Sequence, residues 1–380
     1  MIELIKKNYF VCVGIFLSIV LLVIFNEIFF DNKTFGSSDN LSPKAVGLAL
    51  NEVMEKEGGY PHWQPWVFSG MPTAEAFTNI SQLYFPEYLF KIFSIPGMFI
   101  QISHFLFCGI GMILLLRYLG CTYWSSILGS IGFMITPYMV TMLVFGHGSQ
   151  IMTAAYIPWI VMFAIKLWND PKILNIGILS LLLGFQLQRS HVQIAYYTWL
   201  LIGAFFFFKI INIAYKSKKL DSIVLRKLAF FAVACILGLA ISFVIYLPSI
   251  EYSDFSIRGA SSSGGAKYNY ATSWSFHPKE ILTFLLPSAF GFGGQAYWGY
   301  MPFTDYPNYM GIIVLLLALI ATLQKKNFLQ WYLIITALIA LSISFGKHFS
   351  FVYDIFYSFF PFFNKFRVPS MILILLQFNI

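Results

Sequence analysis

The sequence predicts an all-α polytopic membrane protein, and three observations carry that prediction. Of its 380 residues, 58% are hydrophobic and 11% are charged, whereas soluble domains carry about 25% charged residues. The mean hydropathy is +0.74. Apolar runs long enough to cross about 30 Å of hydrocarbon recur along the chain. These figures exclude a soluble globular domain, a disordered chain and a disulfide scaffold, and the four cysteines form no C-x-x-C pair.

Ten apolar runs are predicted to span the membrane. The first, residues 9–30, follows Lys6 and Lys7 and is too long for a signal-peptide core, so it is interpreted as an uncleaved anchor. The other nine are residues 96–116, 124–145, 151–167, 173–188, 192–211, 228–250, 309–323, 328–345 and 366–380. The last run reaches Ile380 with no polar tail. We therefore expect residues 1–380 to be the N-terminal part of one transmembrane domain whose C-terminal part is absent.

The distribution of basic residues predicts which ends of these spans face the cytoplasm. The N-terminus and every second connection, residues 1–8, 117–123, 166–175, 209–227 and 324–327, together carry thirteen Lys or Arg and three acidic residues. Their net charge is +10, and that of the rest of the chain is −2. Because cytoplasmic loops are enriched in Lys and Arg, this predicts a cytoplasmic N-terminus. The net positive charge of the chain is then explained by membrane topology, and it does not indicate a nucleic-acid partner.

Two long loops, residues 31–95 and 251–308, fall on the outer side in this topology, and no P-loop or G-x-G-x-x-G motif is present. Any chemistry is therefore expected on the outer face or within the membrane. In the first loop Ser42-Pro43 is predicted to open an amphipathic helix that ends at Gly58-Gly59. Asp39 precedes it, either as a cap or turn residue or as a catalytic base or metal ligand. Trp63, beside His62, belongs to an interfacial aromatic belt or stacks on a sugar ring.

Polar residues gather at the outer ends of the predicted spans. His147 lies in the short turn 146–150, either as an ordinary turn residue or as a functional one. Arg189 and His191 interrupt an apolar stretch after the run 173–188, which covers only about 24 Å. A guanidinium below the membrane surface suits a phosphate, whereas the alternative is an arginine that snorkels to the interface. Glu251 and Arg258 lie at the start of the second outer loop. This loop is interpreted either as a lid that faces the substrate or as aromatic residues that pack on the ends of the spans.

Several stretches, in this order, carry a resemblance to a known family. They are Asp39, Pro61-His62-Trp63 with Ser69-Gly70-Met71-Pro72, Gly146-His147-Gly148-Ser149-Gln150 with Ala155-Tyr156-Ile157-Pro158, His191-Val192-Gln193-Ile194-Ala195-Tyr196-Tyr197, Glu251-Tyr252-Ser253 with Ile257-Arg258-Gly259, and Lys365-Phe366-Arg367-Val368-Pro369. The chain resembles the YfhO family of bacterial polytopic membrane proteins, which is similar to the GT-C glycosyltransferases. Gln150 departs from the lysine expected after the serine, which puts a phosphate role of that turn in doubt.

The resemblance implies a GT-C-like fold and a multi-pass protein of the bacterial cytoplasmic membrane. It implies transfer of a sugar from a polyprenyl-phosphate donor to an extracytoplasmic cell-envelope acceptor. The candidate residues are Asp39, His147 and His191 for catalysis, Arg189 and Arg258 for the donor phosphate, and His62, Trp63 and Glu251 for the acceptor or sugar. No second carboxylate lies beside Asp39, so dependence on a divalent cation stays open. The alternative functions are a transporter or flippase of a lipid-linked substrate and a non-catalytic membrane scaffold.

Overall fold

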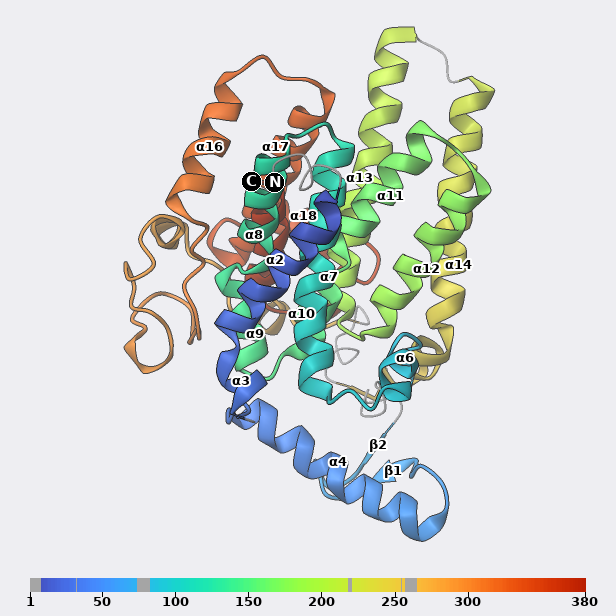
Figure 1. Ribbon diagram of the computed structural model, residues 1–380, viewed down its shortest axis with the longest axis vertical. Coiled ribbons are helices and arrows are strands. Elements are labelled where there is room, and N and C mark those ends of the chain that lie inside the picture. Colours follow the sequence, from blue (N-terminus) through green and yellow to red (C-terminus); the bar gives the residue numbers. More distant parts are fainter. Residues whose placement is uncertain (1–7, 32, 74–82, 218–220, 254, 257–264) are drawn as a thin grey trace. The chain divides into compact units, whose positions relative to one another are not determined.

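The computed structural model describes residues 8–31, 33–73, 83–217, 221–253, 255–256 and 265–380. About 72% of the chain is helical (Figure 1), and the named strands of the described part are one antiparallel pair, β1 (Trp63–Gln64) and β2 (Met71–Pro72). The predicted all-α class is therefore confirmed. The chain divides into two compact units.

Unit 1 consists of residues up to 135, residues 142–191 and residues 233–242. Its helices are α2 (Tyr9–Ile24), α3 (Asn26–Phe30), α4 (Ser38–Glu57), α6 (Glu87–Ile92), α7 (Gly97–Tyr118), α8 (Tyr123–Met134), α10 (Gly148–Ala154), α11 (Ile157–Asn169) and α12 (Ile173–Gln188). Helix α7 is central, because α2, α8, α10 and α11 all contact it. Helix α12 contacts α10 and α11. Two helices, α9 (Pro137–Val144) and α14 (Ser222–Ser253), contribute residues to both units.

Unit 2 consists of residues 136–141, 192–232 and 243–380. Its helices are α13 (Val192–Ser217), α15 (Tyr268–Ala271), α16 (Ile312–Leu323), α17 (Phe328–Ser344), α18 (Ser350–Phe359) and α19 (Leu373–Asn379), with 3₁₀ turns η1 (Pro278–Phe284), η2 (Gly294–Ala296), η3 (Gly346–His348), η4 (Phe363–Lys365) and η5 (Pro369–Ile372). Helices α13, α18 and α19 all contact α17. One apolar core cluster joins Phe276 and Phe284 to Leu373 and Leu376.

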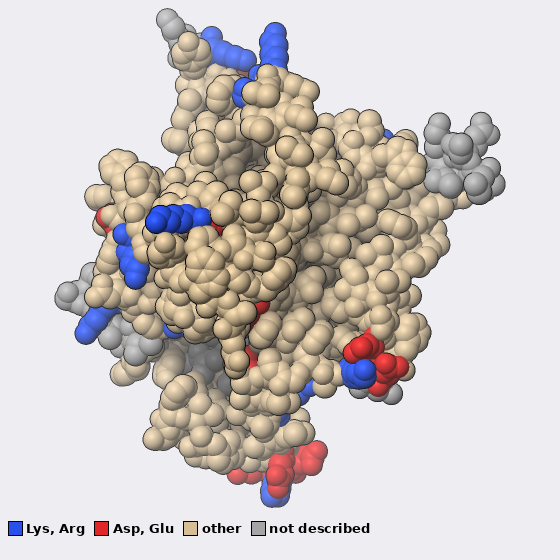
Figure 2. Space-filling model, turned by 90° about the vertical axis from the view of Figure 1, so that its left-hand side faces the viewer, with Lys and Arg blue, Asp and Glu red and all other residues tan. Residues whose placement is uncertain are grey.

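Five helical segments of the described residues are long and apolar enough to cross a membrane. They are Gly97–Tyr118, Tyr123–Val144, Gly148–Asn169, Val192–Lys216 and Ser222–Ser253. The other predicted spans form shorter apolar helices, such as α2 with 16 residues and α16 with 12. The polytopic class is thus supported, whereas the number of ten spans is not confirmed. Charged side chains are sparse over the face shown in Figure 2, as expected of a membrane protein.

Helix α4 begins earlier than the sequence predicts. The expected start was Ser42-Pro43, but the helix starts at Ser38 and carries Pro43 inside its second turn. Proline lacks the backbone N–H that would donate to the Asp39 carbonyl oxygen four residues earlier, so the helix continues through Pro43 with one intrahelical hydrogen bond fewer. The predicted end is confirmed, because Gly58 adopts a left-handed conformation with φ of 73°. Asp39 consequently lies in the first turn of α4.

Candidate functional site

Asp39 and His147, two of the three predicted catalytic residues, lie next to each other in unit 1. The Asp39 Oδ2 atom is 3.6 Å from His147 Nε2, although the two residues are 108 positions apart in the sequence. Both side chains are accessible, with 60% of Asp39 and 37% of His147 exposed. A carboxylate and an imidazole in this arrangement can hold or move a proton for a substrate that reaches the surface.

The start of α4 is docked on the turn that carries His147, and this docking creates the pair. The Asn40 side chain donates to the carbonyl oxygen of Val144 at 2.8 Å and to Ser37 Oγ at 2.8 Å. Gly146 has a φ of 90°, and a Cβ atom there would lie 2.5 Å from the carbonyl carbon of Asp39. Only glycine fits this close approach. His147 then precedes the first residue of α10.

Arg189 is buried in unit 1, with 6% of the residue exposed, so it does not snorkel to a surface. It follows the last residue of α12, and its Nη1 atom is 3.7 Å from Glu87 Oε2. Its guanidinium carbon lies 4.4 Å from the centre of the Tyr84 ring. The Nε and Nη1 groups donate no hydrogen bond to any described residue. A buried guanidinium with unused donors is a strong candidate for binding an anion once its cover moves.

A chain of hydrogen bonds continues from Tyr84 into the helices. His104 Nδ1 is 2.7 Å from the carbonyl oxygen of Ile100, which can only accept, so Nδ1 carries the proton and Nε2 accepts. The Tyr84 hydroxyl therefore donates to His104 Nε2 at 3.0 Å, and the Tyr156 hydroxyl donates to the Tyr84 oxygen. Burial raises the pKa of Tyr84 to about 12, which keeps its hydroxyl protonated. Burial also raises the pKa of Glu87, against the opposing effect of Arg189.

Segment 84–87, in the predicted first outer loop, is thus fixed to the helices at several points. In addition to the contacts of Tyr84 and Glu87, the Phe85 backbone N–H donates to Gln188 Oε1 at 3.1 Å. The Gln188 side chain also donates to the carbonyl oxygen of Ile241 at 3.0 Å. The segment covers the end of α12 and with it the guanidinium of Arg189.

The Asp39–His147 pair and the Arg189 cluster adjoin opposite ends of α10. His147 precedes its first residue, and Tyr156 follows its last residue by two positions. Seven residues of helix span about 10 Å. The structure therefore brings Asp39 and His147 together and places Arg189 in a separate cluster of the same unit.

The remaining predicted site residues are dispersed. His62 and Trp63 are exposed on and beside the β1–β2 pair, where the Trp63 ring packs over Gly70. His191 is half-buried and precedes α13. Glu251 is exposed in the last turn of α14, in unit 2. Arg258 lies outside the described residues.

Sequence reasoning missed the partners of Arg189. Glu87 and Tyr84 lie in a loop segment without a motif, more than 100 positions before Arg189. His104 lies inside the apolar helix α7, and its position within an apolar run was the one signal that could have pointed to it.

Within the described residues, no group of three or more His, Cys, Asp and Glu side chains is arranged to hold a metal ion. No family model, no curated protein and no solved structure matches the chain.

Proposed function

We propose that the chain is a GT-C-like membrane glycosyltransferase, which moves a sugar from a polyprenyl-phosphate donor to a cell-envelope acceptor outside the cytoplasm. The observation that carries this proposal is the Asp39–His147 pair at 3.6 Å, accessible at the end of apolar helices. Each residue is a candidate from the sequence on separate grounds, and the fold brings the carboxylate near the start of α4 to the imidazole of the turn before α10. We place the protein in the bacterial cytoplasmic membrane, with this pair on the outer side.

In the proposed reaction Asp39 is the base. Its carboxylate accepts the proton of the acceptor hydroxyl while the hydroxyl oxygen forms a bond to the anomeric carbon of the sugar. The bond between that carbon and the phosphate oxygen breaks, and its electron pair leaves with the polyprenyl phosphate. His147 takes the proton from Asp39 once the substrate complex brings the two groups from 3.6 Å to hydrogen-bond distance, and His191 is assigned an orienting role.

Arg189 and Arg258 are the proposed ligands of the donor phosphate, and His62, Trp63 and Glu251 are the proposed contacts of the sugar or acceptor. The Arg189 guanidinium is covered by Glu87 and Tyr84. For a phosphate to reach it, segment 84–87 has to withdraw, and the phosphate then replaces Glu87 as the anionic partner.

The test is the Asp39→Asn variant. The wild-type full chain is expressed in a bacterial host, and its envelope glycans are profiled by mass spectrometry against a host without the chain. We expect a sugar addition that depends on the wild-type chain and is lost in Asp39→Asn. The matched control is Asp170→Asn, since Asp170 is also half-exposed and paired, with Lys172 at 2.8 Å. An unchanged glycan profile with Asp39→Asn would rule out Asp39 as the base.

A transporter of a lipid-linked substrate is the second candidate, and one observation favours it. Ionisable groups are buried in unit 1, with His104 of α7 bonded to Tyr84, and Arg189 at the end of α12 paired with Glu87. Buried ionisable residues of membrane helices often line transport pathways. Movement of a fluorescent lipid-linked sugar across proteoliposomes, without any change in its covalent structure, would favour this function over glycosyl transfer.

A further inference from the structure

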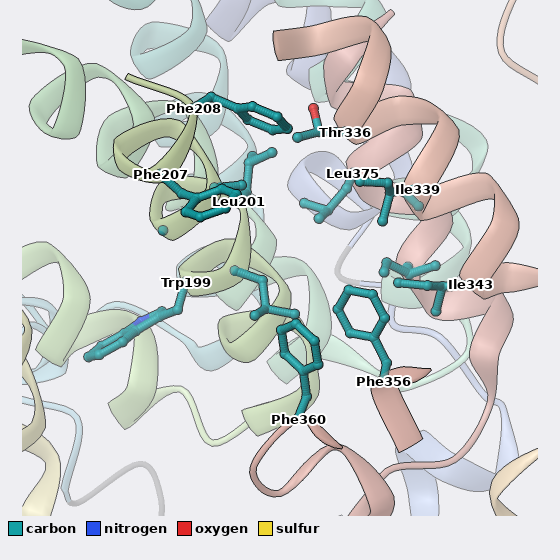
Figure 3. A pocket seen from close by; sticks show the side chains of 15 residues that line it. Trp199, Leu201, Phe207, Phe208, Thr336, Ile339, Ile343, Phe356, Phe360 and Leu375 are labelled. Carbon is teal, nitrogen blue, oxygen red and sulfur yellow. The ribbon is translucent and has the colours of Figure 1, made fainter. Parts of the chain in front are cut away.

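An apolar pocket of about 460 Å³ lies in unit 2, between α13, α17, α18 and α19. Its lining is almost wholly apolar, as Figure 3 shows, with Trp199 and Phe207 from α13 and Phe356 and Phe360 from the end of α18. The volume is typical of a ligand site. Along α13 the pocket extends from Trp199 to Phe208, which is about 14 Å of helix.

The pocket opens where α13 faces its surroundings, because 59% of Phe207 is exposed. Helix α13 belongs to the segment Val192–Lys216, which is long and apolar enough to span a membrane. With α13 spanning the membrane as proposed, this opening faces the acyl-chain region of the bilayer, and an apolar chain can enter sideways.

Two basic residues lie beyond one end of the pocket. Gln193 and Tyr196 share the face of α13 that lines the pocket, since they precede Leu200 by seven and four residues. The Gln193 side chain donates to the carbonyl oxygen of Arg367 at 2.7 Å, and the Tyr196 hydroxyl donates to that of Pro361 at 2.9 Å. Gln193 lies six residues, or about 9 Å, before Trp199. The segment that contains Lys365 and Arg367 is thereby fixed at the head of the pocket.

Arg367 is held by an aromatic clamp and keeps donors available. Its guanidinium carbon is 5.3 Å from the ring centres of both Tyr270 and Trp274, and Nη1 donates to the Tyr270 hydroxyl at 3.3 Å. The side chain is half-buried, and no described carboxylate forms an ion pair with it. Lys365, also half-buried, donates to Ser253 Oγ at 3.2 Å.

Two residues with a strained backbone adjoin this clamp. Val368 has a φ of 59° and Trp274 a φ of 58°, which are unfavourable for residues with a β-carbon and rare for a β-branched one. Strain of this kind persists where the surrounding structure enforces it, and it clusters at ligand clamps. Here the strained residues are Val368, which follows Arg367, and Trp274, whose ring contacts Arg367.

We propose that unit 2 binds an anionic phospholipid, with the lipid phosphate at Lys365 and Arg367 and one acyl chain in the pocket. Charge complementarity selects the headgroup, because a phosphate accepts bidentate hydrogen bonds from a guanidinium. The apolar pocket next to it favours a phosphate that carries an acyl chain over free inorganic phosphate. The site is separate from the Asp39–His147 pair, and the inference does not depend on glycosyl transfer.

The test measures binding in the full-length chain. The protein is reconstituted in nanodiscs of phosphatidylcholine that contain increasing fractions of phosphatidylglycerol with a brominated acyl chain. Bromine quenches tryptophan fluorescence on contact, and the signal of Trp199 is isolated by subtraction of a Trp199→Phe variant. We expect saturable quenching of Trp199 by brominated phosphatidylglycerol at low mole fractions.

Two changes should weaken this binding by separate means. Lys365→Gln with Arg367→Gln should weaken it about tenfold, whereas Lys326→Gln, a basic residue on another loop of unit 2, should not. Gly203→Leu should also abolish the quenching, because Gly203 lines the pocket and a Cβ there meets no atom within 4 Å. Its control is Gly177→Leu in α12, which is equally free of contacts.

Three results would overturn the proposal. Equal quenching by brominated phosphatidylcholine would show that the headgroup charge is not recognised. Quenching that survives Gly203→Leu in a folded protein would place the acyl chain elsewhere. Displacement of the brominated lipid by an equimolar polyprenyl monophosphate would identify the occupant as a different lipid phosphate. Since Asp39→Asn should leave binding unchanged, failure here is distinguishable from failure of the proposed glycosyl transfer.

Discussion

The Arg189 guanidinium and the Glu87 carboxylate are 3.7 Å apart, too far for a hydrogen bond, and both side chains are at most 13% exposed. Two charges in such a place cost desolvation energy that a weak contact does not fully offset. The Tyr84 ring adds a cation–π contact, and Lys91 is a further basic group near Glu87. This pair is therefore a poor means of stabilising unit 1, and a site with a second purpose explains it better.

The Arg189→Gln variant should lower the free energy of unfolding by about 3–5 kcal/mol, because it leaves the Glu87 carboxylate buried without its partner. Chemical unfolding in mixed detergent micelles, followed by circular dichroism, measures the change.

The double variant Arg189→Gln/Glu87→Gln should regain a large part of that loss, since it removes both charges. Arg226→Gln, a change in a basic residue that contacts the Phe230 ring, serves as control and should have little effect. If the single variant were as stable as the wild type, the Arg189–Glu87 pair would not exist in the membrane-embedded protein.

At the scale of the residue, the sequence points to both members of the Asp39–His147 pair, but to only Arg189 in the second polar cluster. Arg189 was recognisable because it interrupts an apolar run, and Asp39 and His147 because they flank such runs. Their mutual contacts were not predictable, since Glu87 and Tyr84 lie more than 100 positions from Arg189, and no local pattern encodes contacts at that separation.

At the scale of the element, α4 is the feature that positions Asp39. Its first turn is anchored by Asn40 on Val144 and by the close backbone approach at Gly146. The carboxylate also lies at the helix N-terminus, where the helix dipole favours negative charge. The helix thus joins the predicted first outer loop to the turn that carries His147.

Gly146→Ala should separate Asp39 from His147, because the added methyl group would collide with the Asp39 backbone at 2.5 Å. We expect loss of most of the proposed transferase activity and faster cleavage of α4 by protease in limited digestion.

Gly120→Ala is the matched control for that experiment. Gly120 has nearly the same φ, 88°, but a Cβ there meets nothing within 4 Å, so the variant carries the strain without the collision. Equal protease sensitivity of the two variants would mean that strain alone, and not the docking of α4, explains the effect.

The helix breaks show what apolar composition leaves undetermined. The runs 124–145 and 151–167 were predicted as single spans, yet each divides into two helices, at Pro137 and before Pro158. Both prolines are the first or second residue of the following helix, a position that needs no N–H donor. Hydropathy predicts that these segments enter the membrane. It does not show where a proline ends one helix and begins the next, because the run stays apolar across the break.

At the scale of the whole molecule, the helical membrane class follows from composition, because few polar residues are available to cover a water-soluble surface. The segregation of Lys and Arg predicts the sidedness of the helices. The described structure supports five spanning helices, and the shorter ones cannot be assigned by length alone. Sidedness therefore remains a prediction of the sequence.

Thiol labelling of intact cells tests the sidedness. In a chain whose four cysteines are replaced by alanine, Trp63→Cys should react with a membrane-impermeant maleimide, because Trp63 is exposed and belongs to the predicted first outer loop. Lys325→Cys, exposed in a predicted cytoplasmic connection, should react only after the cells are broken. The reverse pattern would invert the topology and move the Asp39–His147 pair to the cytoplasmic side.

The docking of segment 84–87 has a consequence for how unit 1 is made during translation. The Phe85 N–H donates to Gln188, which is 103 residues later in the chain, and Glu87 pairs with Arg189. Both partners are synthesised long after the segment itself. Until then the segment has no partner at the end of α12, and contacts of such long sequence separation form late and slowly. Helices α7 to α11 must therefore be inserted first, and the loop closes over them afterwards. In nascent chains that stop before residue 188, Tyr84 can already bond to His104 and Tyr156, but Phe85 and Glu87 lack their partners, so this part of the segment should be more sensitive to protease.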